Sequence, residues 1–246
     1  MLHLLIVNGW SANAGFWAEF SDRVAGDYLV QVIDLDLNIS LEQYLAIIDS
    51  HIQDNTVLIG WSLGGMLVTQ YSAMTKRRFL GVMTLQCNPC FLIQSDWPHA
   101  MSRDDFDTLK NLVSESDLST LVKRFTHLLV SGSEQHKQDR LTLRSIYSIE
   151  KLSSIDVLEN GLVMLETLDV RSALKDISIP CCHVFAEFDA LVPFAVVKDV
   201  ELLVPGHSIE IIENSGHFTQ GFYQEALVNA LNIFASSLID GGKDER

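Results

Sequence analysis

The sequence predicts an α/β protein with a mostly parallel, doubly wound β-sheet. Three observations support this class. Short apolar runs alternate with helical patterns along the chain, which is typical of strand and helix in succession. Most of the apolar runs are continuous, as expected for strands buried on both faces of a parallel sheet. With 246 residues, of which 48% are hydrophobic, the chain is long enough for one sizeable core.

The expected strands and helices follow in order along the chain. Apolar runs bounded by turn signals predict strands at residues 2–7, 29–33, 57–59, 81–85, 182–185 and 208–212. Helical patterns between and after them cover residues 16–24, 41–48, 65–72, 194–203 and 223–238. Ser40 is the predicted N-cap of the second helix, and Pro193 precedes the fourth. The alternation implies right-handed crossover connections.

A Gly-x-Ser-x-Gly motif follows the third predicted strand, where residues 60–65 read Gly-Trp-Ser-Leu-Gly-Gly. A strand before the motif and a helix after it indicate a nucleophile elbow, a strained turn that presents a serine at the helix N-terminus. Glycines on either side of Ser62 permit the close backbone approach that this turn requires. The same string also occurs in flexible loops, but its position here favours an enzyme over a structural turn.

A serine nucleophile needs an imidazole base and a carboxylate, which elbow enzymes carry in the order Ser, Asp or Glu, His at successive strand ends. His217 is the predicted base because it follows the last strand on a loop before the final helix. Asp189, just after the strand at 182–185, is the predicted acid, and Glu187 is its rival. Structural or surface roles are expected for the other histidines, His3, His51, His99, His127, His136, His183 and His207.

An oxyanion formed by attack of Ser62 requires two fixed N–H donors. The amide of Leu63, at the helix start after the nucleophile, is the first predicted donor. The turn Asn8-Gly9-Trp10 after the first strand is expected to supply the second, from the amide of Trp10. The indole of Trp10 would then form a wall of the acyl site, and a core tryptophan is the alternative interpretation.

The alternation of strand and helix is interrupted once, between residues 91 and 168. Helical patterns follow one another there without a strand, with an apolar stripe at 118–129 and further patterns at 135–147 and 153–166. We therefore predict a core of residues 1–90 and 169–246 and a helical cap of residues 91–168 over the active site. An independent helical domain is the alternative, and it is disfavoured because both ends re-enter the same sheet.

Charge and cysteine content exclude several classes of function. The net charge of −15 argues against nucleic acid or an anionic membrane as a partner. The N-terminus lacks the basic region of a signal peptide, and no apolar stretch reaches the roughly 20 residues of a membrane span. The four cysteines, Cys87, Cys90, Cys181 and Cys182, are expected to be buried, reduced thiols of a cytoplasmic protein, without the spacing of a zinc site.

With the elbow, acid and base placed, the sequence resembles the α/β-hydrolase superfamily over nearly its whole length. Within it, the chain is similar to the pimeloyl-[acyl-carrier protein] methyl ester esterases of biotin synthesis. The most specific strings are Asp96-Trp97-Pro98 and the segment 157–171. Further strings that carry the likeness are Asn8-Gly9-Trp10, Asn88-Pro89-Cys90-Phe91 and Asp189-Ala190-Leu191-Val192-Pro193.

The resemblance implies an activity and a set of positions. Ser62 would attack the methyl ester of a pimeloyl chain on acyl-carrier protein, methanol would leave, and water activated by His217 would free the carboxylate from the acyl-enzyme. The implied fold is an α/β-hydrolase fold that lacks the opening hairpin and carries its cap after the sixth family strand. Asn8 stands where the family usually has histidine. The implied substrate contacts are Trp10, Leu63, Phe125, Thr126, His127, Leu128 and Leu129.

Basic residues concentrate in one part of the predicted cap. Residues 120–144 contain five lysines and arginines against Glu134 and Asp139 only. The resemblance implies a carrier protein that docks on basic residues of the cap, and an acidic partner would be attracted to such a patch on an acidic protein. A solvated helix face is the ordinary alternative. The predicted docking residues are Arg124, Lys137, Arg140 and Arg144.

Two other functions stay open on the sequence alone. One is a broad carboxylesterase for short acyl esters that has the same catalytic residues and no carrier partner. The other is a non-hydrolytic lyase or ligand-binding protein with a vestigial triad. For all three we expect a monomer without cofactor or metal.

Overall fold

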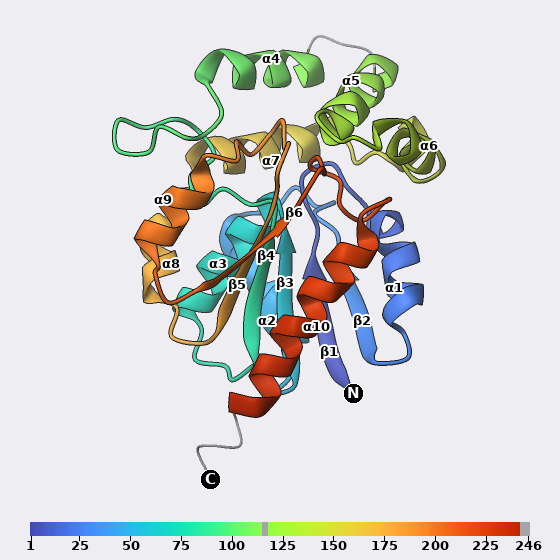
Figure 1. The fold of residues 1–246 in the computed structure, drawn as a ribbon. Helices are drawn as coiled ribbons and strands as arrows, with labels where there is room; N and C mark the ends of the chain where they lie inside the picture. The colour runs from blue at the N-terminus through green and yellow to red at the C-terminus, as the bar shows by residue number, and fades with distance from the viewer. Residues whose placement is uncertain (115–117, 242–246) are drawn as a thin grey trace.

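The structure, a computed structural model, describes residues 1–114 and 118–241. Within these residues, parallel strands form one six-stranded sheet in the order β2-β1-β3-β4-β5-β6 (Figure 1). This confirms the parallel α/β class predicted from the sequence. The strands are Leu2–Val7 (β1), Tyr28–Ile33 (β2), Thr56–Trp61 (β3), Gly81–Leu85 (β4), Cys181–Ala186 (β5) and Ser208–Ile212 (β6).

The burial of each strand follows from its place in the sheet. Every residue of the inner strands β3, β4 and β5 is buried, which explains their continuous apolar sequences. The two edge strands, β2 and β6, keep exposed positions. The helical layers therefore enclose the middle of the sheet most completely, and the third strand, which leads to Ser62, lies in that middle.

Helices lie on both faces of the sheet (Figure 1). Helices α1 and α10 contact one another on one face, and α3 contacts both α2 and α8 on the other. The predicted N-cap of α2 is confirmed, because Ser40 and Gln43 exchange the two hydrogen bonds of a capping box. The elements are Ala14–Trp17 (a 3₁₀ turn, η1), Ala18–Val24 (α1), Leu41–His51 (α2), Leu63–Met74 (α3), Arg171–Asp176 (α8), Val196–Leu203 (α9) and Gln224–Gly241 (α10).

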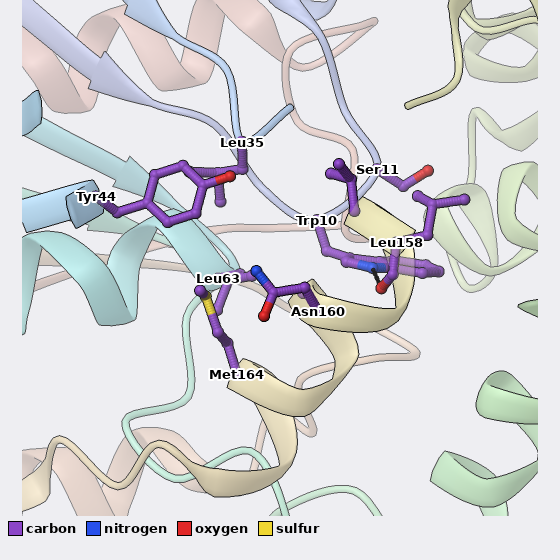
Figure 2. A pocket seen from close by; sticks show the side chains of 10 residues that line it. Trp10, Ser11, Leu35, Tyr44, Leu63, Leu158, Asn160 and Met164 are labelled. Atoms are coloured by element: carbon purple, nitrogen blue, oxygen red, sulfur yellow. Dashed lines mark hydrogen bonds between the residues drawn. The ribbon is translucent and has the colours of Figure 1, made fainter. Parts of the chain in front are cut away.

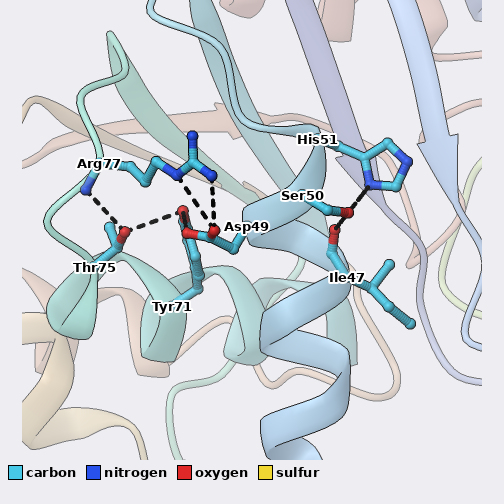
Figure 3. A network of polar contacts seen from close by, with 7 residues as sticks. All are labelled: Ile47, Asp49, Ser50, His51, Tyr71, Thr75 and Arg77. Atoms are coloured by element: carbon cyan, nitrogen blue, oxygen red, sulfur yellow. Dashed lines mark hydrogen bonds and ion pairs between the residues drawn. The ribbon is translucent and has the colours of Figure 1, made fainter.

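A polar network joins α2 to the C-terminal end of α3 (Figure 3). Asp49 accepts a hydrogen bond from the hydroxyl of Tyr71 at 2.9 Å and pairs with the guanidinium of Arg77 at 3.1 Å. The hydrogen bond from Arg77 is the main reason that the pKa of Asp49 is lowered. Because these groups are partly exposed, the network adds little stability. Its effect is to hold the far end of the helix whose N-terminus carries Ser62.

Helices α4 to α7 follow one another between β4 and β5, as the sequence predicted, and cover the carboxyl ends of the strands (Figure 1). They are Arg103–Ser114 (α4), Leu118–Val130 (α5), His136–Ile146 (α6) and Ile155–Thr167 (α7), with a 3₁₀ turn at Ile149–Lys151 (η2). Residues 91–101 are not helical, and isolated bridges pair Leu92 with Met101 and Gln94 with Trp97. We call residues 91–168 the insertion. Its division from the core as a cap stays a prediction, and residues 115–117 and 242–246 of the predicted domains lie outside the described residues.

The two ends of the insertion meet at its base. Cys90 bridges to Asp169, and the indole N–H of Trp97 donates to the side-chain oxygen of Asn88 at 2.8 Å. The guanidinium of Arg171 lies 5.3 Å from the ring centroid of Trp97 and pairs with Asp96 at 3.0 Å. Asp96 and Trp97 therefore close the base of the insertion, and neither lines the cavity that contains Ser62. We call these contacts the basal clasp.

Two expectations about composition can be compared with the structure. All four cysteines are free and buried, and burial raises the pKa of the Cys87 thiol to about 12, as expected of inert core thiols. In residues 1–114 and 118–241, no helix has the length and apolar character required to cross a membrane.

Candidate active site

Ser62 occupies the turn between β3 and the first residue of α3. Its backbone has φ 54° and ψ −120°, a positive φ that residues other than glycine rarely adopt. The amide of Ser62 donates to the carbonyl of Leu85 at 2.9 Å, and its carbonyl accepts from the amide of Gly65 at 2.9 Å. These bonds hold the strained turn in place, and the serine lies at the N-terminus of the helix. This is the geometry expected of a nucleophile elbow.

The two glycines of the motif are required by backbone contacts. A Cβ on Gly60 would lie 2.4 Å from the carbonyl oxygen of Gly64. A Cβ on Gly64 would lie 2.2 Å from the carbonyl oxygen of Val7 at the end of β1. The first turn of α3 thus lies directly against the end of β1, and this contact brings Ser62 next to the turn that contains Trp10.

The structure brings His217 and Asp189 together. Nδ1 of His217 donates to Oδ2 of Asp189 at 2.7 Å, and these side chains are only 2% and 1% exposed. The other carboxylate oxygen of Asp189 accepts from the amides of Leu191 and Val192 at 2.8 and 2.9 Å. The carboxylate is therefore fixed by backbone donors and fixes the imidazole in turn, so that Nε2 remains the free nitrogen.

The rival acid, Glu187, has a different position. Its carboxylate accepts from the amide of Asn214 at 2.9 Å, three residues before His217. Glu187 therefore braces the loop that carries the histidine, while Asp189 contacts the ring itself. None of the other histidines contacts Asp189, and His183, for example, lies within β5 and contacts Thr84 and His207.

Ser62 and His217 line one small cavity. Its volume is about 20 Å³, enough for roughly one water molecule. Apolar side chains from the insertion close it, and the rings of Trp10 and Phe125 meet edge to face at 4.8 Å. A serine, a paired histidine and apolar walls can support acyl transfer with bulk water excluded.

Two backbone amides beside Ser62 have no acceptor among the described residues. The amide of Leu63 begins α3 and has no acceptor within the helix. Neither it nor the amide of Trp10 donates to another described residue. The turn before Trp10 is rigid because buried Asn8 accepts from the amide of Gly9 at 3.1 Å and donates to Asp34 at 3.0 Å. Asn8 thus orders the predicted oxyanion turn through its side chain.

The side chain of Trp10 connects this turn to the insertion. Its indole N–H donates to the carbonyl of Leu158 on α7 at 2.8 Å, as Figure 2 shows. Gly161 makes room for the ring, because a Cβ there would lie 2.5 Å from Trp10 Cδ1. The sequence offered no sign of this hydrogen bond, since its partner is a backbone carbonyl far along the chain.

The structure distributes the predicted substrate contacts among several places. Trp10, Phe125 and Leu129 line the Ser62 cavity. Leu63 lines the neighbouring pocket of Figure 2, and Leu128 lines a third pocket beside Leu191. Thr126 is buried but does not line the Ser62 cavity. The structure does not bring His127 to the cavity either, because it is exposed and lies 3.4 Å from the guanidinium of Arg140.

The predicted docking residues lie on two neighbouring helices, α5 and α6. Arg124, Lys137 and Arg144 are exposed, and Arg140 is half-buried. Among the described residues, none of the four has a carboxylate within ion-pair distance. We call these four residues the basic patch. Its charges are therefore available to an acidic partner.

Comparisons with known proteins agree with the fold. A sequence model described as alpha/beta hydrolase fold matches residues 31–222. A pimeloyl-[acyl-carrier protein] methyl ester esterase of Salmonella newport (strain SL254) is 28% identical over 244 residues, spanning 96% of this chain and 94% of the relative. The protein of the same name from Salmonella heidelberg (strain SL476) has the same identity and coverage.

Solved structures give the same fold at lower sequence identity. A bromoperoxidase from Bacillus anthracis superposes with a TM-score of 0.78 at 18% identity, over 94% of this chain and 92% of its own. An esterase from Exiguobacterium antarcticum gives a TM-score of 0.76 at 17% identity, over 99% and 92%. At these identities the likeness concerns the fold alone.

Proposed function

The chain belongs to the alpha/beta hydrolase family and is a carboxylic ester hydrolase, and from that premise we propose that Ser62, His217 and Asp189 form its catalytic triad. The observation that carries the proposal is the 2.7 Å contact of His217 with Asp189 beside the cavity that Ser62 shares with His217. Burial of the pair and the strained backbone of Ser62 support it further.

The proposed reaction follows from these positions. Nε2 of His217 takes the proton of Ser62 as the serine oxygen attacks the ester carbonyl, and Asp189 stabilises the imidazolium. The amides of Leu63 and Trp10 donate to the oxyanion. His217 then protonates the departing alcohol, and the acyl group remains on Ser62. A water molecule deprotonated by His217 cleaves this acyl-enzyme and releases the carboxylic acid.

We propose the methyl ester of pimeloyl-[acyl-carrier protein] as the substrate, with methanol as the departing alcohol. Relatives of this name cover nearly the whole chain, and the basic patch, which has no carboxylate within ion-pair distance among the described residues, would attract an acidic carrier to an otherwise acidic protein. The Ser62 cavity has room for roughly one water, so an acyl chain needs further space. A pocket of about 370 Å³ adjoins it across Leu109 and Leu191, and we propose that these side chains move when substrate binds.

The triad is tested with a serine-directed phosphonate and a p-nitrophenyl ester. The wild-type protein should be labelled and should hydrolyse the ester, whereas Ser62→Ala should do neither. Hydrolysis by Ser62→Ala at the wild-type rate would refute the triad.

The proposed substrate is tested in a biotin auxotroph that lacks a pimeloyl-[acyl-carrier protein] methyl ester esterase. The wild-type chain should restore growth and Ser62→Ala should not.

Carrier docking is tested with a charge-reversed variant, Arg124→Glu/Lys137→Glu/Arg140→Glu. We expect it to lose at least about tenfold in kcat/KM on carrier-bound methyl ester and to keep its rate on the p-nitrophenyl ester. The matched control is Lys76→Glu/Arg78→Glu/Lys198→Glu, which makes the same charge change at exposed residues outside the patch. Equal loss in both triple variants, or no loss in either, would favour the broad short-acyl esterase without a carrier partner.

A further inference from the structure

The loop that carries His217 is held by α5, α6 and the turn between them, which we call the α5–α6 unit. We call residues 214–222 the His217 loop. Figure 1 shows this loop, just before α10, next to α6. Three hydrogen bonds join the two segments: Glu134 N to Asn214 O at 3.0 Å, Phe218 N to Leu129 O at 3.0 Å and Phe222 N to Asp139 Oδ1 at 2.8 Å. The first two use backbone atoms only, so only the third depends on a side chain.

Asp139 is a fully buried carboxylate on α6. While Oδ1 accepts from Phe222, Oδ2 accepts from the hydroxyl of Ser133 at 3.0 Å. Burial raises the pKa of Asp139, and the hydrogen bonds from Phe222 and Ser133 partly offset this effect. Among the described residues it has no lysine or arginine within ion-pair distance. A buried carboxylate that accepts from only two donors among the described residues is costly to the fold, which suggests that it has another use.

The fit between Asp139 and the loop is close. A Cβ on Gly221 would lie 2.5 Å from Oδ1 of Asp139, so the carboxylate lies directly against the loop backbone. At the other end of the loop, a Cβ on Gly216 would lie 2.9 Å from the carbonyl oxygen of Ser131. His217 is therefore held between two points where the loop touches the α5–α6 unit, and one of these points is Asp139.

We propose that Asp139 is a positioning residue that fixes the His217 loop to α6 and thereby sets the imidazole against Ser62. The inference rests on the proposed function, because it assumes that His217 is the base. It also joins two parts of that function, since Lys137 and Arg140 of the basic patch belong to the same helix. Correct placement of a catalytic group within about 1 Å changes rates by roughly 100-fold, so this side chain should act on kcat.

The test compares Asp139→Ala with Asp139→Asn on a p-nitrophenyl ester. Both variants remove the charge, but asparagine can still accept from Phe222 and donate to the hydroxyl of Ser133. Rates are divided by the number of active sites titrated to completion with a serine-directed phosphonate, which removes the effect of any unfolded fraction. We expect kcat to fall about 10- to 100-fold in Asp139→Ala with KM within about twofold, and to recover to within about threefold in Asp139→Asn.

The matched control is Glu166→Gln. Glu166 joins α7 to α4 through Arg103 and Lys110, and it makes no contact with the His217 loop, so kcat should be unchanged. If Asp139→Ala does not fold, Ser133→Ala serves in its place, and kcat should fall about threefold because one carboxylate oxygen loses its donor.

Three results would overturn the proposal. The first is a kcat within twofold of wild type in folded Asp139→Ala or, where that variant does not fold, in Ser133→Ala. The second is a change in KM without a change in kcat, and the third is a kcat of Asp139→Asn as low as that of Asp139→Ala. Failure of the proposed function itself gives a different result, because Ser62→Ala would then retain activity whatever Asp139 does.

Discussion

The carboxyl edge of the sheet and the insertion above it are held in place by different kinds of contact. At the sheet edge, backbone meets backbone, as where a Cβ on Gly64 would lie 2.2 Å from the carbonyl of Val7. The insertion has two backbone hydrogen bonds to the His217 loop, but elsewhere it is tied down by single side chains, such as Trp10 on the carbonyl of Leu158 and Asn160 on that of Ile39. The contrast indicates that the backbone around Ser62 tolerates almost no substitution, whereas much of the insertion can be altered one side chain at a time.

The largest expected effect is at the sheet edge. Asp189→Asn should lower kcat on a p-nitrophenyl ester by about 10⁴-fold, because the amide would favour the wrong imidazole tautomer. The control is Glu187→Gln, which keeps an acceptor for the amide of Asn214 and does not touch the ring. We expect the control to stay within about twofold of wild type. Equal losses in the two variants would mean that the loop, and not the Asp189 contact, sets the rate.

The second effect tests the backbone contact itself. Gly64→Ala should reduce the free energy of unfolding in urea by about 3 kcal/mol, because its Cβ has no space between β1 and α3. Gly26→Ala is the control, since a Cβ there meets nothing within 4 Å. Two variants of equal stability would show that the contact between β1 and α3 yields to an added methyl group.

The third prediction concerns His183, a buried histidine away from the site, and tests whether the interior of the sheet also disfavours charge there. Burial lowers the pKa of His183 from 6.5 to about 3. From pH 6.5 down to about 3 the unfolded chain binds a proton that the folded chain does not, so His183 removes stability as the pH falls, by up to about 1.4 kcal/mol per pH unit. Between pH 7 and pH 5, the free energy of unfolding in urea should fall less for His183→Gln than for the wild type. An equal fall in the two proteins would contradict this.

The smallest effect concerns the contact between the oxyanion turn and the insertion. Trp10→Phe removes one buried hydrogen bond, to Leu158, and should lower kcat/KM by about fivefold, corresponding to about 1 kcal/mol. Trp97→Phe makes the same chemical change in the basal clasp, where the indole donates to Asn88. It should lower the melting temperature and leave kcat/KM unchanged. A similar loss of kcat/KM in both would mean that the insertion acts as a rigid whole.

Most of the sheet could be predicted because strands that are buried on both faces have continuous apolar sequences. The strands β1, β4 and β6 have the predicted bounds, and the others extend the predicted runs by one to three residues. The positions of Ser62, Asp189 and His217 follow from a local motif and from chain order at strand ends, and both are visible in sequence.

The contacts of the insertion could not be predicted in the same way. Trp97 reaches Asn88 through an irregular loop without periodicity, so no pattern marks the pair. Asp139 was counted only as an acidic residue among basic ones, yet it shares a helix face with Leu143, which lies four residues later and is buried. That spacing could have indicated its burial, but not its partner, the amide of Phe222.

The basal clasp has a consequence for how this architecture can diversify. Cys90 and Asp169 are bridge partners, so the chain leaves the core and returns to it at one point. The segment between them is therefore a long loop whose two ends are joined. Its length and content can change without moving either neighbouring strand, since lengthening a loop whose ends are already joined costs little entropy. Insertions of unrelated sequence could replace one another on the same hydrolase core, provided that each supplies an acceptor for the indole N–H of Trp10 and one for the amide of Phe222.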